Sequence, residues 1–261
     1  MQTSLDFPID LPANAYVYGT RADGGTHGVV LTKPHVVELI LDLVGYTADA
    51  DLSTKTLLEP SVGHGAFLLA AVTRLLALCR AHGKNVADLD NAFAAFDIDA
   101  AHVEHTRDAL VETLQRGGVA TKIARHLASQ WVTAGDFLLS PIAGRFDFIV
   151  GNPPYIRIEQ LAPDLQSEYR RRYSTIFDRA DLYVAFIERS LRLLSPQGAL
   201  AFVCADRWTL NRYGAPLRKL VSSEFEVRTY VDLHQASPFE DDVIAYPSIF
   251  VIARERTGNP V

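Results

Sequence analysis

The sequence predicts one α/β domain with a seven-stranded, mostly parallel sheet and helices on both faces. Short apolar runs alternate with longer segments in which apolar residues recur at helical spacing. A strand, a glycine loop and a helix follow one another within residues 56–71. Acidic or amide side chains follow each of the first four predicted strands. These observations place polar groups along one edge of a parallel sheet.

The individual elements follow from apolar periodicity and from turn residues. Thr32 is expected to cap a helix that has Pro34 in its first turn and reaches Val44. A second helix begins after Gly65, and Asp99 is expected to cap a third. The predicted strands cover residues 56–58, 92–96, 130–134, 146–150, 199–204, 227–231 and 247–253, and the later helices cover 100–116, 181–194 and 212–223.

Length and composition exclude several classes of protein. The 261 residues, 48% of them hydrophobic, suffice for one large core. No apolar run is long enough to span a membrane, and the first residues lack the basic segment of a secretory signal. Two cysteines are too few for a disulfide framework. A net charge of −6 argues against coating nucleic acid by charge alone. We therefore expect a cytoplasmic protein.

The most informative stretch is the end of the fourth predicted strand, Asn152-Pro153-Pro154-Tyr155. The side-chain oxygen of Asn152 and the carbonyl of Pro153 can both accept hydrogen bonds from an exocyclic NH2 group. The two prolines make the turn rigid. Tyr155 offers a flat face for stacking. This pattern favours a cradle for a planar amide or base.

The first glycine loop carries a carboxylate in place of a complete phosphate-binding fingerprint. Gly63 and Gly65 bring the backbone close to a ligand, but Leu68 stands where a third glycine is expected. Glu59 precedes the loop and would repel a pyrophosphate, whereas it suits an ammonium or sulfonium group. Asp97, at the end of the second strand, is placed to bind ribose hydroxyls.

Three further features flank this edge of the sheet. Asp136 and Phe137 end the third strand, where they can bond and pack against an adenine, although a turn role for Asp136 stays open. Residues 156–179 interleave arginines and aromatics, which suits a nucleic-acid backbone as well as a solvated helix. The histidines and glutamate of the 100–116 helix match no zinc motif, and we expect no metal.

Together these pieces resemble the N6-adenine DNA methyltransferases of restriction–modification systems, in the gamma order of motifs. The resemblance covers roughly residues 28–253, and Asn152-Pro-Pro-Tyr155 is its most specific part. Glu59-Pro60-Ser61-Val-Gly63-His-Gly65, Asp97, Gly135-Asp136-Phe137 and Asp181-Leu-Tyr183 also match. The resemblance implies a Rossmann-like class I S-adenosylmethionine-dependent methyltransferase fold.

The resemblance also implies a role for each matching position. Thr32 and residues Glu59, Pro60, Ser61, Gly63 and Gly65 would face the methionine end of S-adenosylmethionine. Asp97 would hold the ribose, and Ile98 would lie beside the cofactor's adenine. Asp136 would bond the amino group of that adenine, and Phe137 and Phe186 would flank its ring. Asn152, Pro153, Pro154 and Tyr155 would hold a flipped target adenine, with contacts from Val30, Phe239, Arg157 and Arg171 on the DNA side.

The chain departs from the family pattern at its end. Few residues follow the last predicted strand, so no separate target-recognition domain is visible. We expect an N-terminal extension (1–28), a catalytic domain (29–255) and a tail (256–261). DNA is the expected partner, with recognition supplied by another domain or a specificity subunit and with a cognate endonuclease.

Two other functions stay open from the sequence. A glutamine amide in a protein, or the N2 of guanine in RNA, also presents a planar NH2 to Asn-Pro-Pro-Tyr. A non-catalytic subunit that binds cofactor or a partner is the second alternative. Neither Cys79 nor Cys204 lies in a Pro-Cys motif, which counts against cytosine C5 chemistry.

Overall fold

The structure, a computed structural model, describes residues 30–240 and 246–254. The expected extension (1–28) and tail (256–261) lie outside the described residues. Within the described residues, no helix is long and apolar enough to cross a membrane.

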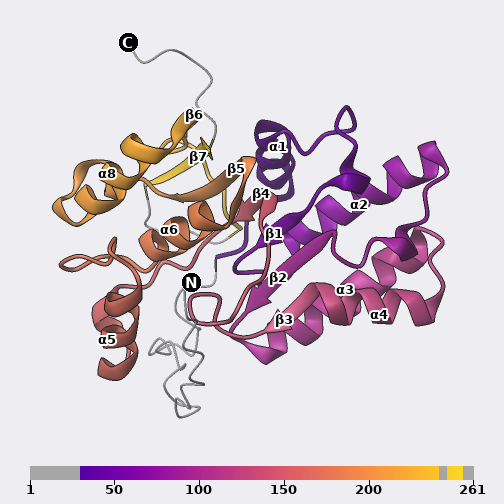
Figure 1. The fold of residues 1–261 in the computed structure, drawn as a ribbon, viewed down its shortest axis with the longest axis horizontal. Helices are drawn as coiled ribbons and strands as arrows, with labels where there is room; N and C mark the ends of the chain where they lie inside the picture. The colour runs from indigo at the N-terminus through magenta and orange to yellow at the C-terminus, as the bar shows by residue number, and fades with distance from the viewer. Residues whose placement is uncertain (1–29, 241–245, 255–261) are drawn as a thin grey trace, which may run out of the picture.

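A seven-stranded sheet in the order β3-β2-β1-β4-β5-β7-β6 forms the centre of the domain (Figure 1). The first five strands are mutually parallel where they pair, and β7 runs antiparallel to both β5 and β6. This confirms the predicted seven-stranded, mostly parallel sheet. The strands are β1 Leu57–Glu59, β2 Phe93–Asp97, β3 Val132–Ala134, β4 Phe146–Gly151, β5 Leu194–Ala205, β6 Glu226–Asp232 and β7 Pro247–Ala253.

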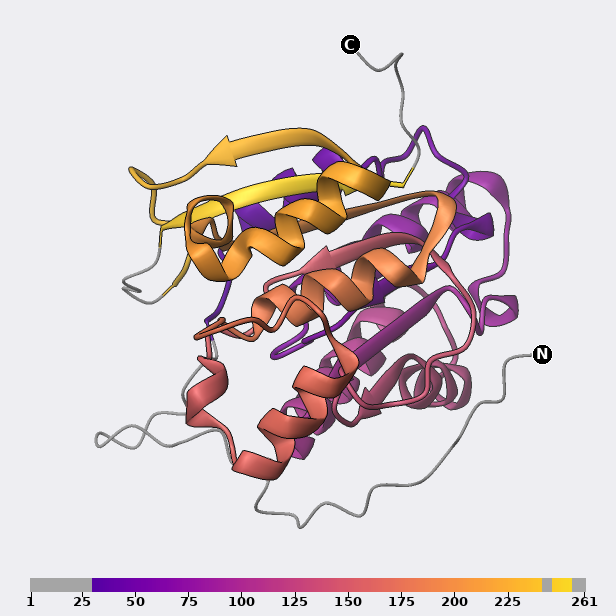
Figure 2. The same cartoon turned by 60° about the vertical axis from the view of Figure 1, so that its left-hand side comes forward.

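Helices cover both faces of the sheet because its strands are apolar on both sides. One apolar cluster packs α1 to α4 against the sheet, and the other packs α5, α6 and α8 against the opposite face. In Figure 2, α6 and α8 run side by side along the sheet. The helices are α1 Pro34–Val44, α2 Ala66–His82, α3 Ala100–Arg116, α4 Thr121–Trp131, α5 Pro163–Arg172, α6 Tyr183–Leu193, α7 Arg207–Leu210 and α8 Ala215–Glu224. Short 3-10 helices cover Leu52–Thr54, Val86–Asp88, Ile158–Gln160 and Arg212–Gly214.

Three expectations about local structure were wrong. The strand predicted at 130–134 begins only at Val132, because Trp131 is the last residue of α4 and is fully buried in its apolar stripe. The strand predicted at 199–204 begins earlier, because β5 already starts at Leu194, with an irregular register against β4. Thr32 does not cap α1: Lys33 occupies that position, and the Thr32 hydroxyl accepts a hydrogen bond from Asn152 instead. The Asp99 cap of α3 is confirmed, since its carboxylate accepts the Ala101 N–H at 2.8 Å.

The turn after β5 is packed so closely that it admits no larger residue at Gly214. A Cβ atom there would lie 1.8 Å from the backbone oxygen of Trp208. This packing holds the neighbouring Tyr213, whose hydroxyl donates to Asp181 Oδ2 at 3.0 Å.

We therefore expect Gly214→Ala to lower the free energy of unfolding by about 2 kcal/mol or more, because the backbone around Trp208 must move. Leu210→Ala is the matched control: Leu210 lies in the same region with 82% of its surface exposed, and surface changes usually stay within about 0.5 kcal/mol. Urea unfolding measures both. Equal stability of the two variants would contradict this account of the turn.

Candidate active site

The carboxyl ends of β1, β2, β3 and β4 bring the predicted site residues to one edge of the sheet. Backbone and side-chain bonds join the loops that follow these strands. The Gly135 N–H donates to the Asp97 carbonyl at 2.8 Å, next to the β2–β3 pairing. The Ser61 hydroxyl donates to the Asn152 carbonyl at 3.0 Å and so ties the β1 loop to the β4 loop. In a parallel α/β sheet this edge is where ligands bind.

The amide of Asn152 is held in one orientation by the segment that precedes α1. Its Nδ2 donates to the Val30 carbonyl at 2.9 Å and to the Thr32 hydroxyl at 3.3 Å. A carbonyl oxygen only accepts, so the nitrogen must face Val30 and the oxygen must face away. That oxygen, Oδ1, is buried and has no hydrogen-bond partner among the described residues. Such an unpaired acceptor costs about 1–3 kcal/mol, which marks it as a place for an external donor.

Two aromatic rings lie beside this amide. Tyr155 and Phe239 pack edge to face, with ring centroids 6.0 Å apart. Phe239 is buried, and it is fixed by a backbone bridge between its own residue and Thr32. Burial raises the pKa of Tyr155 well above its usual value, so its hydroxyl is neutral. A planar group stacked between the rings requires one of them to turn, because two stacking contacts need about 7 Å.

The glycine loop surrounds a buried carboxylate. Glu59 is 1% exposed, and its Oε2 accepts the Leu68 N–H at 2.9 Å in the first turn of α2. Burial raises its pKa well above the usual value, and the charge of Asp97 adds to this. Gly65 has a φ of +83°, and a Cβ there would come within 3.0 Å of Thr106. The loop therefore requires glycine at this point, next to a carboxylate that lacks a cationic partner in the described structure.

Asp97 organises the loop from the neighbouring strand. Its Oδ2 accepts the Gly63 N–H at 2.8 Å, and its Oδ1 accepts the Asp99 N–H at 2.9 Å. The Nδ1 atom of His102 lies 3.3 Å from Oδ1, and this contact raises the pKa of His102. The carboxylate is thus fixed beside the glycine loop.

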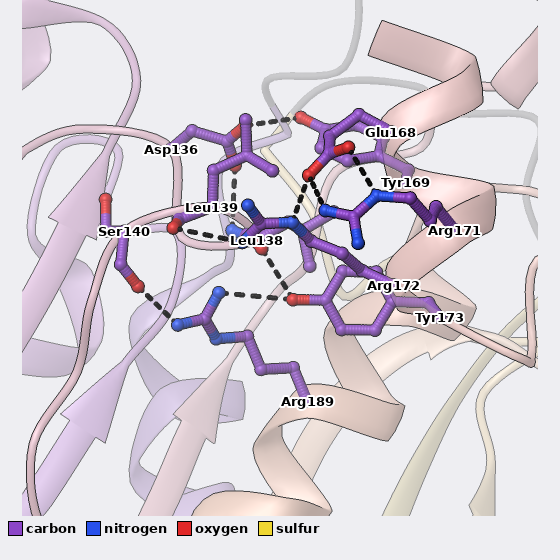
Figure 3. Close-up of polar contacts among 10 residues, drawn as sticks. All are labelled: Asp136, Leu138, Leu139, Ser140, Glu168, Tyr169, Arg171, Arg172, Tyr173 and Arg189. Atoms are coloured by element: carbon purple, nitrogen blue, oxygen red, sulfur yellow. Dashed lines mark hydrogen bonds and ion pairs between the residues drawn. The ribbon is translucent and has the colours of Figure 1, made fainter. Parts of the chain in front are cut away.

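Asp136 is buried in the turn after β3, with 7% of its surface exposed. Its Oδ1 accepts the Leu138 N–H at 2.7 Å, and its Oδ2 accepts the Tyr169 hydroxyl at 2.6 Å (Figure 3). Burial raises its pKa, which the bonds from Tyr169 and Leu138 partly offset. The turn role left open from the sequence is therefore present, and each oxygen keeps capacity for a further donor.

Phe137 and Phe186 contact each other beside Asp136, with ring centroids 5.3 Å apart and planes inclined by 33°. Both are buried. At this separation no base fits between them, since two stacking contacts need about 7 Å. A cofactor adenine would lie against this pair, or would separate the rings.

The structure places the remaining predicted residues at the edge or on its flank. Pro60, Pro153, Pro154 and Ile98 are buried or half-buried in the loops already described. Arg157 is exposed and forms a backbone bridge with Asp181 at the start of the α6 segment. Arg171 lies on α5, where it bonds Glu168 at 2.8 Å with 67% of its side chain exposed. The described contacts do not join Arg171 to the Asn152 group.

Sequence reasoning missed several residues that hold the site. The Val30 carbonyl fixes Asn152, but a backbone atom gives no signal in a sequence. Tyr169, Tyr173 and Arg189 bond the turn that begins at Asp136. The aromatic residues among the arginines of 156–179 stand out in the sequence, but their pattern suits a nucleic-acid backbone as well as a solvated helix and does not point to the Asp136 turn.

Histidines gather next to the glycine loop without forming a metal site. The ring centroids of His64 and His102 lie 5.3 Å apart, and those of His64 and His105 lie 4.8 Å apart. Across the part of the chain that the structure describes, no group of three or more His, Cys, Asp or Glu side chains could hold a metal ion.

Comparisons with known proteins agree with this geometry. Residues 67–239 match the Eco57I restriction-modification methylase family. The chain is 48% identical over 252 residues to the Type II methyltransferase M.PaeR7I of Pseudomonas aeruginosa, across 95% of this chain and 44% of that protein. It is 45% identical over 233 residues to the Type II methyltransferase M.XhoI of Xanthomonas vasicola, across 88% of this chain and 43% of that protein. The chain thus spans less than half the length of these relatives.

The fold matches solved methyltransferase structures. A Listeria monocytogenes protein described as a class I S-adenosylmethionine-dependent methyltransferase aligns with a TM-score of 0.61 and 14% identity. The alignment covers 91% of this chain and 66% of that chain. The expected class I methyltransferase fold is therefore confirmed.

The buried carboxyl of Glu59 predicts a specific pH dependence of stability. Because burial raises its pKa in the folded state, Glu59 stabilises the fold most below its unfolded pKa, and that contribution is lost as pH rises through the folded value. Glu59→Gln should remove this dependence, so that wild type loses stability relative to the variant as pH rises from about 5 to 8.

Urea unfolding across this pH range measures the difference. Glu104→Gln is the control for loss of one carboxylate, because Glu104 is exposed on α3. A constant difference between wild type and Glu59→Gln at every pH would show that the buried carboxyl is not the source.

Proposed function

Since the chain belongs to the Eco57I restriction-modification methylase family, we propose that it transfers a methyl group from S-adenosylmethionine to N6 of a flipped-out adenine in DNA. The observation that carries this proposal is the orientation of Asn152, whose buried Oδ1 lacks a partner among the described residues. An exocyclic NH2 is the kind of donor that such an acceptor fits.

The residues along the edge fit the proposed cofactor. Glu59 is a buried carboxylate without a cationic partner in the described structure, which suits the positively charged methionine end. The loop at Gly63 and Gly65 lets backbone approach closely, and Asp97 beside it suits ribose hydroxyls. Asp136, next to Phe137, has acceptor capacity for the 6-amino group of the cofactor's adenine. When bound, S-adenosylmethionine supplies an electrophilic methyl group on its sulfonium.

Asn152 and Pro153 act on the target nitrogen. The N6 lone pair of adenine is delocalised into the ring, which makes that nitrogen a poor nucleophile. Asn152 Oδ1 and the Pro153 carbonyl accept hydrogen bonds from the two N–H groups of N6. These bonds localise the nitrogen lone pair and direct it toward the methyl group. Tyr155 and Phe239 stack on the base and offset part of the unstacking cost of flipping, a few kcal/mol. Positioning and electrostatics account for the rate, with no covalent intermediate on the protein.

We propose that residues 29–255 form the catalytic domain and that sequence recognition lies elsewhere. The chain spans 44% of its relative M.PaeR7I, so another part of a longer protein, or a specificity subunit, has room to read the DNA. A cognate endonuclease and a cytoplasmic location belong to this proposal.

Methyl transfer followed by nucleoside analysis tests the reaction. The full-length protein is incubated with labelled S-adenosylmethionine and, in separate arms, genomic DNA, bulk RNA or protein release factor. The proposal predicts N6-methyldeoxyadenosine in the DNA arm. Label confined to RNA or to release factor, or cofactor binding without transfer to any acceptor, would contradict it.

Asn152→Ala should lower the rate of transfer at least about a hundredfold, because it removes an acceptor that acts on the reacting nitrogen. Affinity for S-adenosylmethionine should change by less than about threefold, since the residues proposed to hold the cofactor remain. Asn91→Ala, an exposed asparagine before β2, should leave both unchanged. Near wild-type transfer by Asn152→Ala would refute the assigned role.

A further inference from the structure

The turn from Asp136 to Ser140 is held by side chains from α5, from the residue after α5 and from α6 (Figure 3). From α5, the Tyr169 hydroxyl donates to Asp136 Oδ2 at 2.6 Å, and the hydroxyl of Tyr173, the residue that follows α5, donates to the Leu138 carbonyl at 2.6 Å. From α6, Arg189 donates to the Ser140 carbonyl and to the Tyr173 hydroxyl. Both tyrosines are buried. The contacts fix the turn relative to α5.

The arginines of α5 are engaged within the same region. Arg171 and Arg172 both bond Glu168, and Arg172 also reaches the Leu139 carbonyl at 3.4 Å. Arg170 donates to the carbonyls of Ile176 and Asp178, at 3.1 and 2.8 Å. Only the bond of Arg172 to the Leu139 carbonyl joins α5 to the turn. The other bonds stay within α5 and the segment that follows it.

We propose that Tyr169 is a positioning residue for the cofactor, whose hydroxyl fixes the Asp136 carboxylate so that its remaining acceptor capacity meets the 6-amino group of the cofactor's adenine. The inference rests on the proposed function, in which Asp136 binds that amino group. It makes α5 a part of the cofactor site. Two of the geometric requirements are present: the carboxylate is nearly fully buried, and each of its oxygens already accepts one bond that sets its direction.

The charge state of Asp136 depends on the same contact. The groups that face it are Tyr169 and Arg172 from α5, Tyr173 directly after α5, and Arg189 from α6. Burial raises the pKa of Asp136, whereas the Tyr169 bond, the Leu138 N–H and the two arginines lower it. Removal of the Tyr169 hydroxyl therefore raises that pKa further. An ionised carboxylate is the stronger acceptor. As the pH falls, both proteins should therefore lose cofactor affinity, and the loss should begin at a higher pH in the Tyr169→Phe variant than in wild type.

The test compares Tyr169→Phe with Tyr173→Phe, its matched control at the residue that follows the same helix. Tyr173→Phe also removes a buried hydroxyl that bonds this turn, but it leaves the carboxylate of Asp136 with both of its bonds. Calorimetry measures binding of S-adenosylhomocysteine from pH 5.5 to 8.5. A second probe carries purine in place of adenine and so lacks the 6-amino group. Asp136→Asn reports on the carboxylate itself.

Tyr169→Phe should lower the affinity for S-adenosylhomocysteine about three- to tenfold near neutral pH, which is the usual effect of one hydrogen bond. At pH 6 the affinity should fall by more. Tyr173→Phe removes a bond to the same turn but leaves both bonds of the Asp136 carboxylate, so any loss of affinity should be equal for the two probes and should keep the pH profile of wild type. The purine probe should bind Tyr169→Phe and wild type equally. In steady-state assays, KM for the cofactor should rise while kcat stays constant, because the proposed role of Tyr169 lies in cofactor binding through Asp136.

The ratio of the two probe affinities, taken on one preparation, cancels any loss of folded protein. An unchanged ratio in Tyr169→Phe, or equal weakening of both probes, overturns the inference. If Asp136→Asn loses S-adenosylhomocysteine affinity while Tyr169→Phe does not, only the positioning role fails. If wild type binds neither probe, or Asp136→Asn binds S-adenosylhomocysteine as wild type does, the proposed cofactor site fails and the inference fails with it.

Discussion

The hydrogen bond from Asn152 Nδ2 to the Val30 carbonyl is the contact on which the rest of the account depends. It sets the direction of the amide. As a result, an acceptor and not a donor faces the position proposed for the target base. The segment that supplies this carbonyl is fixed in turn: Thr32 bridges Phe239, and the Lys33 N–H donates to the Pro238 carbonyl at 2.9 Å. One short segment thus connects the amide, the stacking ring and the start of α1.

Two buried carboxylates lie on one side of this amide along the sheet edge, Glu59 at the end of the adjacent strand β1 and Asp136 after β3. Glu59 and Asp136 each have a pKa raised by burial, so each costs stability when ionised. Their surroundings differ in a way that matches different partners. Glu59 accepts one backbone N–H in the described structure, which leaves it poorly compensated and suited to a cation. Asp136 accepts bonds on both oxygens, and these bonds and two arginines partly offset the effect of burial on its pKa. This arrangement suits a fixed acceptor for an uncharged NH2.

The sequence predicts the sheet and its polar edge because both depend on local patterns. Apolar strands, positive-φ glycines and acids at strand ends can be recognised within a few residues, and Glu59, Asp97, Asp136 and Asn152 do lie at that edge. Contacts between distant segments cannot be recognised in this way. The strand predicted at 130–134 includes Trp131, whereas tertiary packing makes it the last residue of α4. Tyr169 is 33 residues from Asp136, and no local rule distinguishes its buried hydroxyl from an exposed one. The role of each site residue toward cofactor or DNA stays a prediction.

The distance from Asn152 Oδ1 to N6 of the target adenine tests the central claim most directly. It is measured in a crystal structure of the full-length protein with S-adenosylhomocysteine and a duplex that carries the mapped methylation sequence. The account predicts a flipped adenine with N6 about 2.7–3.2 Å from Oδ1, while Nδ2 remains on the Val30 carbonyl. An adenine still stacked in the duplex, or an amide turned so that Nδ2 faces the base, would contradict it.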